Sequence, residues 1–366
     1  MSKRRSFLLY PLSLIYGFIT GFRNFLYNTK VLPSSEFAIP VISVGNITVG
    51  GTGKTPHTEY LVELLQRRFK VAVLSRGYKR TSSGFKVVTA SSTVSDAGDE
   101  PLQIARKFPG VLVAVDINRK NGITKIIEAH PEIEVILLDD AFQRRQITPG
   151  LSILLTDFGR LMTRDYMLPY GNLRESISNM RRADVIIVTK TPADITPMQR
   201  RLTVKDIDKA AYQSLFFTSV KYNCPKPLFE TNELIAKPDF SNPNNTGVLL
   251  VTGIANPRPF KEFIQTIANE VIHLQYPDHY KFKEKKDIVK ISESFAKLKS
   301  PVKYIITTEK DSVRLKEFTN ITALLQNTVY YFPIDIDFLH DYKNDFDKLI
   351  TDYVRKNKRN NRISEI

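Results

Sequence analysis

The chain has 366 residues, of which 42% are hydrophobic and 25% charged. That length is enough for two domains with a sizeable core, and the composition excludes a mostly disordered chain. The single cysteine, Cys224, excludes an internal disulfide and fits a reducing compartment. Lysine and arginine outnumber aspartate and glutamate by 53 to 38, a net charge of +15. This excess favours anionic partners: a nucleotide, a nucleic acid, a phosphorylated substrate or an acidic lipid.

The N-terminus combines a basic start, Lys3-Arg4-Arg5, with an apolar and aromatic run over Phe7–Phe22 that ends at Arg23. A secretory signal would place small residues after the apolar run, and this sequence does not. The run is also short for a spanning helix and is interrupted by proline, serine and glycine. We therefore predict a helix over 1–30 that lies in a membrane interface. The alternative is a helix that packs its apolar side on the protein's own core.

A glycine-rich loop follows the apolar run Ile39–Val44 and precedes a stretch with helical periodicity. Strand, glycine loop and helix are the context in which Gly-Lys-Thr predicts a phosphate-binding loop. The glycines let backbone N–H groups approach phosphates, the lysine reaches the β- and γ-phosphates, and the threonine hydroxyl can ligate Mg²⁺. Thr48 stands where the usual pattern has glycine. The residues predicted to bind the nucleotide are Thr48, Val49, Gly50, Gly51, Thr52, Gly53, Lys54 and Thr55.

Strand-like and helical stretches then alternate, which predicts βαβ units and a mostly parallel sheet flanked by helices, as in P-loop NTPases. The strands are predicted at Val71–Ser75, Val111–Val115, Val135–Leu138, Leu151–Thr156 and Val185–Val188. Ligands of such sheets bind beyond the carboxyl ends of the strands, which is where the phosphate loop, Asp99 and Asp139 fall.

A second α/β block is predicted after a proline- and asparagine-rich region, with strands at Val248–Thr252, Tyr304–Thr307 and Val329–Phe332. We thus expect an interfacial helix (1–30), a P-loop domain (31–213), a connecting segment (214–246), a smaller α/β/α domain (247–354) and a basic tail (355–366).

Asp139 closes an apolar strand downstream of the phosphate loop, the arrangement that delivers a carboxylate to Mg²⁺. Asp140 is a weaker candidate, because adjacent carboxylates on a strand point to opposite sides. His279, in an aromatic and acidic loop, is a candidate for orienting the nucleophile, although a surface histidine is the commoner explanation of such a residue. Asp99 is another candidate, and it could instead cap a helix.

These residues can be read in three ways. The first is a membrane-associated kinase that uses Mg²⁺ and ATP. The second is an ATPase or GTPase switch acting on a membrane or nucleic-acid partner. The third is a cytosolic kinase for a soluble sugar or cofactor precursor. No recognisable nucleic-acid module supports a nucleic-acid partner, and no obligate protein partner is inferred.

The chain resembles the lipid A disaccharide 4′-kinases (tetraacyldisaccharide 4′-kinases) of Gram-negative bacteria. The resemblance runs over almost the whole chain and rests on motifs in the family's order. The motifs are the hydrophobic-basic N-terminus, Val44–Pro56, Ser75-Arg-Gly-Tyr78, Gly98-Asp-Glu-Pro101, Asp139-Asp-Ala-Phe-Gln143, Asn172-Leu-Arg-Glu175, Pro277-Asp-His-Tyr280 and Thr308-Glu-Lys-Asp311.

The resemblance implies transfer of the ATP γ-phosphate to the 4′-hydroxyl of an acylated glucosamine disaccharide 1-phosphate. It implies a peripheral protein at the cytoplasmic face of the bacterial inner membrane, on an anionic membrane surface. It also implies two α/β/α domains with the active site in the cleft between them. Asp99 is then the catalytic base supported by His279, while Asp139, Asp140 and Glu175 are active-site carboxylates. Thr55, Asp139 and Glu175 are the implied Mg²⁺ ligands. Ala141 and Arg144 depart from the family's Asp-Asp-Gly-Phe-Gln-His-Arg, so no role is carried over from that histidine to this chain.

Overall fold

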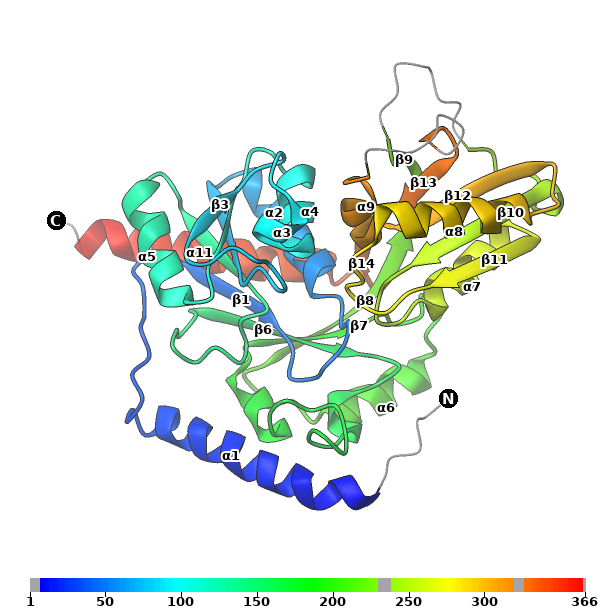
Figure 1. Cartoon of the computed structure of the whole chain (residues 1–366). Helices are drawn as coiled ribbons and strands as arrows, with labels where there is room; N and C mark the ends of the chain where they lie inside the picture. The colour runs from blue at the N-terminus through cyan, green and yellow to red at the C-terminus, as the bar shows by residue number, and fades with distance from the viewer. Residues whose placement is uncertain (1–6, 230–237, 319–325, 365–366) are drawn as a thin grey trace. The chain divides into compact units, whose positions relative to one another are not determined.

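The computed structural model describes residues 7–229, 238–318 and 326–364. Two compact units divide the chain. The first comprises Met1–Ala97, Ile104–Val220 and Ile336–Ile366, and the second comprises Gly98–Gln103 and Lys221–Asp335. Each unit contains one β-sheet with helices, so the predicted α/β class is confirmed (Figure 1).

The first sheet has nine strands in the order β14-β8-β7-β6-β1-β5-β2-β4-β3. Neighbours from β8 to β4 pair in parallel, and β3 pairs antiparallel with β4 at the edge. The strands are β1 (Val41–Gly45), β2 (Val71–Ser75), β3 (Lys86–Val88), β4 (Leu112–Val115), β5 (Val135–Asp139), β6 (Leu151–Asp157), β7 (Val185–Thr189), β8 (Ser214–Tyr222) and β14 (Ile334–Phe338). The central strands are continuous apolar runs because helices bury both faces of a parallel sheet.

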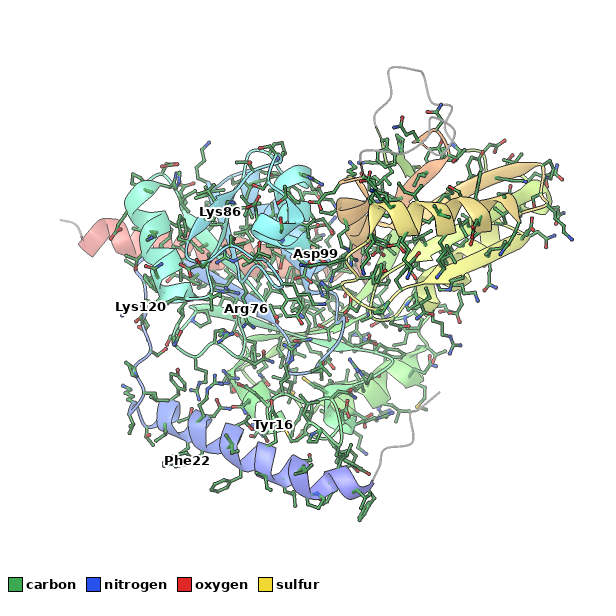
Figure 2. The ribbon with its side chains drawn as sticks, in the orientation of Figure 1. Tyr16, Phe22, Arg76, Lys86, Asp99 and Lys120 are labelled. Atoms are coloured by element: carbon green, nitrogen blue, oxygen red, sulfur yellow. The ribbon has the colours of Figure 1, made fainter. Side chains whose placement is uncertain are left out.

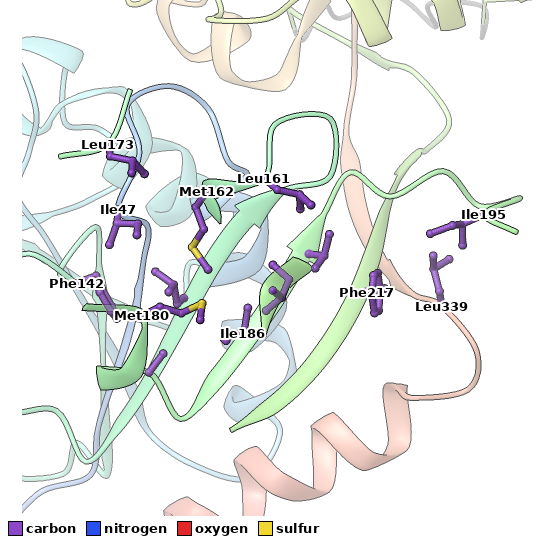
Figure 3. Close-up of a cluster of buried hydrophobic side chains, with 14 residues drawn as sticks. Ile47, Phe142, Leu161, Met162, Leu173, Met180, Ile186, Ile195, Phe217 and Leu339 are labelled. Atoms are coloured by element: carbon purple, nitrogen blue, oxygen red, sulfur yellow. The ribbon is translucent and has the colours of Figure 1, made fainter. Parts of the chain in front are cut away.

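The helices of this unit include α2 (Lys54–Gln66), α3 (Val94–Ala97), α5 (Arg119–Ala129), α6 (Pro197–Ile207) and α11 (Lys343–Ser364), with 3₁₀ turns η2 (Met162–Arg164) and η3 (Ile177–Arg182). Helix α4 (Asp99–Lys107) is divided between the two units after Gln103. Helix α2 packs on β1, β2 and β5, and α5 packs on β2. On the β6–β8 side, Leu154, Ile186 and Phe217 meet Met162 and Met180 in one buried cluster (Figure 3). This cluster lies under the loops that follow β1 and β5, since Ile47 and Phe142 are part of it.

The second sheet has the order β11-β10-β12-β13-β9 and is parallel except for β9. Its strands are β9 (Lys226–Pro227), β10 (Thr246–Thr252), β11 (Glu270–Gln275), β12 (Val302–Thr308) and β13 (Val329–Phe332). Its helices are α7 (Arg258–Ile267), α8 (Glu284–Ala296) and α9 (Glu309–Leu315), with the 3₁₀ turn η4 (Pro243–Asn245). Alternate residues of β10 face opposite ways, so Leu249 packs with Ile291 of α8 while Leu250 packs with Phe260 of α7. The sheet is therefore the middle of three layers.

The predicted connecting segment 214–246 is wrong in its first part. Ser214–Tyr222 forms β8 and pairs with β7, because its alternating apolar side chains reach the core of the first unit. Residues 230–237 of that segment lie outside the described residues.

The C-terminal part of the chain also differs from the expectation. Ile336–Ile366 belongs to the first unit, where Phe338 and Phe346 pack against Phe216 of β8. The predicted basic tail is helical up to Ser364, as the end of α11, and Arg355 and Lys356 at its start are exposed. Gly98–Gln103, predicted in the P-loop domain, belongs instead to the second unit.

Helix α1 (Tyr10–Asn28), preceded by the 3₁₀ turn η1 (Phe7–Leu9), turns its polar side inward. Ser13 and Asn24 are buried, whereas nine large apolar side chains are more than half exposed. They are Phe7, Leu8, Leu12, Leu14, Ile15, Phe18, Ile19, Phe22 and Phe25. Tyr16 lies on the side of α1 that faces the first unit, and Phe22 on the other (Figure 2). The alternative in which the apolar side packs on the protein's own core is therefore wrong.

Within the described residues, every helix is too short or too polar to cross a membrane. Lys3, Arg4 and Arg5 lie outside the described residues.

Candidate active site

The loop between β1 and α2 is held by hydrogen bonds to its outward-facing carbonyl oxygens. Arg160 donates to Val49 O (2.6 Å), Thr189 donates to Thr52 O (2.9 Å), and Lys190 donates to Gly51 O. His57 Nδ1 lies 2.7 Å from Gly53 O. Since the donors keep the negative ends of these peptides turned outward, the loop presents its positive side inward, as an anion site requires.

Two glycines of this loop adopt backbone angles that other residues rarely reach. Gly50 has φ +99° and Gly53 has φ +86°, and Gly53 is the residue immediately before α2. Thr48, in contrast, is absent from the residues with positive φ. Its β-bridge to Leu173 needs only extended backbone, which explains why threonine is acceptable at the usual glycine position.

His57 is buried and neutral. Burial lowers the pKa of His57 to about 4. The hydrogen bond to Gly53 acts to raise this pKa, and the charge of Lys190 lowers it further. Nδ1–H therefore donates to Gly53 O, and Nε2 accepts from the Thr218 hydroxyl at 3.0 Å.

The strand register places Asp139 beside the phosphate loop. Val44 of β1 lies opposite Asp139 of β5, so the loops after both strands leave the same edge of the sheet. The Asp139 carboxylate is buried and accepts hydrogen bonds from Thr58 (3.2 Å) and Ser75 (3.4 Å). These bonds hold it in one orientation.

Asp140 is brought to the phosphate loop as well. Its φ of +50° turns the chain at the end of β5, and one carboxylate oxygen lies 3.5 Å from Lys54 Nζ. The other oxygen lies 3.9 Å from Arg174. The objection that adjacent carboxylates diverge does not hold here, because the chain leaves the strand at this residue.

The segment Asn172–Glu175 also joins the phosphate loop. Asn172 O accepts from Val49 N (2.8 Å), and Arg174 N donates to Ile47 O (2.7 Å). Glu175 is buried and paired with Arg182, whose guanidinium lies 4.4 Å from the centre of the Phe142 ring. Burial raises the pKa of Glu175, with Arg182 acting in the opposite direction.

The inner side of α1 is bonded to these same loops. Ser13 donates to Met167 O (2.7 Å), and Tyr16 donates to Arg174 O (3.1 Å). Arg23 donates to Gln143 O, and Arg145 donates to Asn24 O, both at 2.7 Å. The helix with the exposed apolar side is thus attached to the segments that carry Asp140 and Glu175.

The second unit contains the other predicted pair. His279 Nδ1 lies 2.8 Å from Asp99 Oδ2, and Lys310 Nζ lies 3.1 Å from His279 Nε2. Burial acts to raise the pKa of Asp99, but the bond from His279 and the charges of Lys310 and Arg314 outweigh it. The pKa of Asp99 is therefore below its ordinary value. The pair is an ionised acceptor next to a donor.

Sequence reasoning missed four residues of these sites: Arg160, Lys190, Arg182 and Lys310. Lys310 stands inside the quoted motif Thr308-Glu-Lys-Asp311, which was a usable signal. Arg160 and Lys190 follow β6 and β7, at the same edge of the sheet as the phosphate loop, so their position after strands was the available clue. Arg182 had no sequence signal.

Within the described part of the chain, no group of three or more histidine, cysteine, aspartate or glutamate residues could hold a metal ion by itself. Mg²⁺ commonly uses one or two protein ligands together with phosphate oxygens and water. A fixed Asp139 carboxylate and the Thr55 hydroxyl beside an anion-binding loop fit that mode of binding.

Comparison with known proteins identifies the family. The family model for tetraacyldisaccharide-1-phosphate 4′-kinase matches residues 5–355. The chain is 46% identical to the tetraacyldisaccharide 4′-kinase of Bacteroides thetaiotaomicron, over 98% of this chain and 95% of the relative. It is 41% identical to that of Flavobacterium johnsoniae, over 96% and 97%.

A solved structure agrees with these relatives. LpxK from Aquifex aeolicus in complex with ATP superposes with a TM-score of 0.71 at 28% identity, over 94% of this chain and 98% of that one. The chain therefore belongs to the tetraacyldisaccharide-1-phosphate 4′-kinase family and is an ATP-dependent kinase of the lipid A disaccharide precursor.

Proposed function

We propose that two clusters of the residues described above carry out this phosphoryl transfer. The first, at the phosphate loop, consists of Lys54, Thr55, Asp139 and Asp140 with the loop backbone. The second consists of Asp99 and His279. The observation that carries the proposal is the hydrogen bond between His279 and Asp99, since it joins an ionised acceptor to a group that orients it.

The first cluster binds and orients ATP. Lys54 neutralises charge on the transferring phosphate, and the loop N–H groups hold the triphosphate. Mg²⁺, when bound, neutralises charge on the phosphate oxygens, and Thr55, Asp139 and Glu175 are the proposed residues to hold it. Hydrogen bonds from Thr58 and Ser75 fix the orientation of the Asp139 carboxylate.

The second cluster accepts a proton. The 4′-hydroxyl oxygen forms its bond to the γ-phosphorus while the bond from that phosphorus to the bridging oxygen of ADP breaks. The hydroxyl proton passes to the Asp99 carboxylate, which the low pKa keeps ionised at neutral pH. His279 donates to the other side of that carboxylate and fixes its direction.

In this proposal, helix α1 lies in the headgroup region of an anionic membrane, at the cytoplasmic face of the inner membrane. Its exposed side is almost entirely apolar and aromatic. Because exposing such a side to water is unfavourable, it favours an apolar surface such as a membrane interface. An acylated disaccharide 1-phosphate resides in the same interface. Docking through α1 would bring that substrate to the loops that α1 holds.

One assay tests the proposal. Wild-type protein and Asp99→Asn are given ATP labelled in the γ-phosphate, Mg²⁺, and acylated disaccharide 1-phosphate in vesicles of zwitterionic and anionic lipid. We expect label in the 4′-phosphorylated lipid from wild type, and transfer lowered by about 10²–10⁴-fold in Asp99→Asn with ATP binding retained. Release of labelled phosphate to water at an equal rate with and without the lipid would instead support a nucleotide switch.

A further inference from the structure

The ammonium group of Lys310 lies against the proposed catalytic pair. Its Nζ is 3.1 Å from His279 Nε2, 3.0 Å from Glu100 Oε1 and 4.0 Å from Asp99 Oδ2. Lys310 is the second residue of α9, and its side chain is mostly buried. Nothing in the roles given to Asp99 and His279 above accounts for a lysine at this place.

The three side chains form a chain of hydrogen bonds with one possible direction. An ammonium group donates and cannot accept, so His279 Nε2 must be the acceptor and carries no proton. A neutral imidazole then carries its proton on Nδ1, which is the atom 2.8 Å from the Asp99 carboxylate. Lys310 donates to His279, and His279 donates to Asp99.

Lys310 stays charged in these surroundings. Burial acts to lower its pKa, but the charges of Glu100, Asp99 and Asp278 outweigh this, so that the pKa of Lys310 lies above its ordinary value. Other charged groups near His279 include Asp278, with a carboxylate oxygen 3.9 Å from Nε2, and Arg314, whose charge acts on Asp99.

The Thr308-Glu-Lys-Asp311 motif builds the frame for this contact. The Thr308 hydroxyl caps α9 by accepting from Asp311 N, and Asp311 accepts from Gly253 N (2.9 Å). Gly253 O in turn accepts from His279 N (3.1 Å). The backbone of His279 and the start of α9 are thus fixed to the same residue, which sets the distance between Lys310 and the imidazole.

Arg314 completes the frame from the next turn of α9. It donates to Tyr280 O (3.0 Å) and Gly253 O (3.2 Å), and it pairs with Asp311. Three residues of this short helix, Lys310, Asp311 and Arg314, therefore serve to hold one histidine.

We propose that Lys310 is a positioning residue that holds His279 in its Nδ1–H tautomer and keeps a proton off Nε2. The inference rests on the proposed function of Asp99 as the base. If His279 bound a second proton, the resulting imidazolium would withdraw charge from the Asp99 carboxylate and make it a poorer proton acceptor. Lys310 thereby keeps the pair in the form in which His279 donates to the Asp99 carboxylate.

The tautomer can be read directly in the wild-type protein. Imidazole ¹⁵N spectra of protein labelled in its histidines, with His279 assigned by comparison with His279→Gln, should show Nδ1 protonated and Nε2 unprotonated between pH 7.5 and 8.5. A proton on Nε2 in this range would overturn the proposal without any need for a variant.

Three variants test the role of the ammonium group. Lys310→Met removes the donor and its charge, Lys310→Arg keeps both, and Lys281→Met is the matched control at an exposed lysine two residues after His279. In Lys310→Met we expect a ¹⁵N signal from protonated Nε2, because the donor that keeps a proton off this atom is gone. The acidic limb of the kcat/KM profile should move to higher pH, with KM for ATP unchanged. Lys310→Arg should restore most of both readouts, and Lys281→Met should match wild type.

The outcomes separate this inference from the proposed function. An unchanged His279 spectrum and an unchanged acidic limb in folded Lys310→Met would overturn the role of Lys310. A changed spectrum with an unchanged rate profile would uphold the tautomer and overturn Asp99–His279 as the base.

Discussion

His279 Nδ1 lies 2.8 Å from Asp99 Oδ2, although the two residues are 180 positions apart in the chain. Both belong to the second unit, because Gly98–Gln103 groups with Lys221–Asp335 rather than with the rest of α4. The pair therefore forms within one unit.

The first prediction concerns this pair. Asp99→Ala and His279→Ala should each lower kcat by about 10²–10⁴-fold, since either change removes an oriented base, and KM for ATP should change little. The double variant should be scarcely slower than the slower single variant, because residues that act as a unit are not additive. Steady-state kinetics of the four proteins gives the answer. Losses that multiply would show that the residues act separately.

The second prediction concerns Lys54. Lys54→Ala should lower kcat/KM by at least about a hundredfold, because it removes a charge that the transition state needs. Because the Lys54 side chain is only 13% exposed, thermal unfolding of the variant is measured beside the kinetics to show that it is folded. Lys205→Ala, at an exposed lysine on α6, is the control. Near-normal turnover of a folded Lys54→Ala protein would contradict the role of the loop.

A third prediction concerns the outer side of α1. Phe18 and Phe22 are 75% and 55% exposed, and each phenylalanine moved out of water contributes roughly 1.5–3 kcal/mol. Phe18→Ser/Phe22→Ser should lower affinity for anionic vesicles at least about tenfold and raise KM for the lipid more than for ATP. Met198→Ser/Leu202→Ser on α6 removes exposed apolar area of a similar kind and should bind vesicles normally. Vesicle co-sedimentation measures the difference, and equal partitioning of all three proteins would remove the interfacial assignment.

The fourth prediction uses the lowered pKa of His57, about 4 in the folded protein against 6.5 ordinarily. The unfolded chain binds a proton here between these values and the folded protein does not, so this contribution to stability is complete above pH 6.5. It is lost as the pH falls toward 4, by about 3 kcal/mol in all. Between pH 7 and pH 4.5, the free energy of unfolding measured with denaturant should fall more steeply for wild type than for His57→Asn. Parallel curves would mean that the pKa of His57 is the same in the folded and unfolded protein.

The fifth prediction separates two roles for Glu175. If it holds Mg²⁺, Glu175→Gln should raise the Mg²⁺ concentration needed for half-maximal rate. If it serves mainly as the partner of Arg182, Glu175→Gln should lower the unfolding temperature and leave the Mg²⁺ requirement unchanged. Arg182→Met leaves Glu175 buried without its ion pair and should cost several kcal/mol of stability in either case. Titration of Mg²⁺ in the assay, beside thermal unfolding, distinguishes the two.

Local patterns in the sequence determined the central strands and the phosphate loop. Val71–Ser75 is a continuous apolar run between polar residues, and it forms β2 with those bounds. Glycines at 50 and 53 before Lys54 predicted the turn and the helix start, because only glycine adopts such φ values without strain. Asp139 could be placed from its position at the end of an apolar strand, because strands of a parallel sheet end at one edge.

Tertiary structure decided the features that depend on partners distant in the chain. The sequence around Ser214–Tyr222 does not distinguish a strand from a linker. The segment forms β8 because it pairs in parallel with the edge of β7. Asn172–Glu175 lies beside the phosphate loop through backbone bonds from Val49 and Arg174, which no side-chain pattern encodes. The same holds for α1: its composition predicted an interfacial helix, but which side faces outward depended on the carbonyl oxygens that Ser13 and Tyr16 could reach. Lys310 and His279 lie close together for a similar reason. Gly253, which follows β10, donates to the Asp311 carboxylate next to Lys310 and accepts from the backbone N–H of His279.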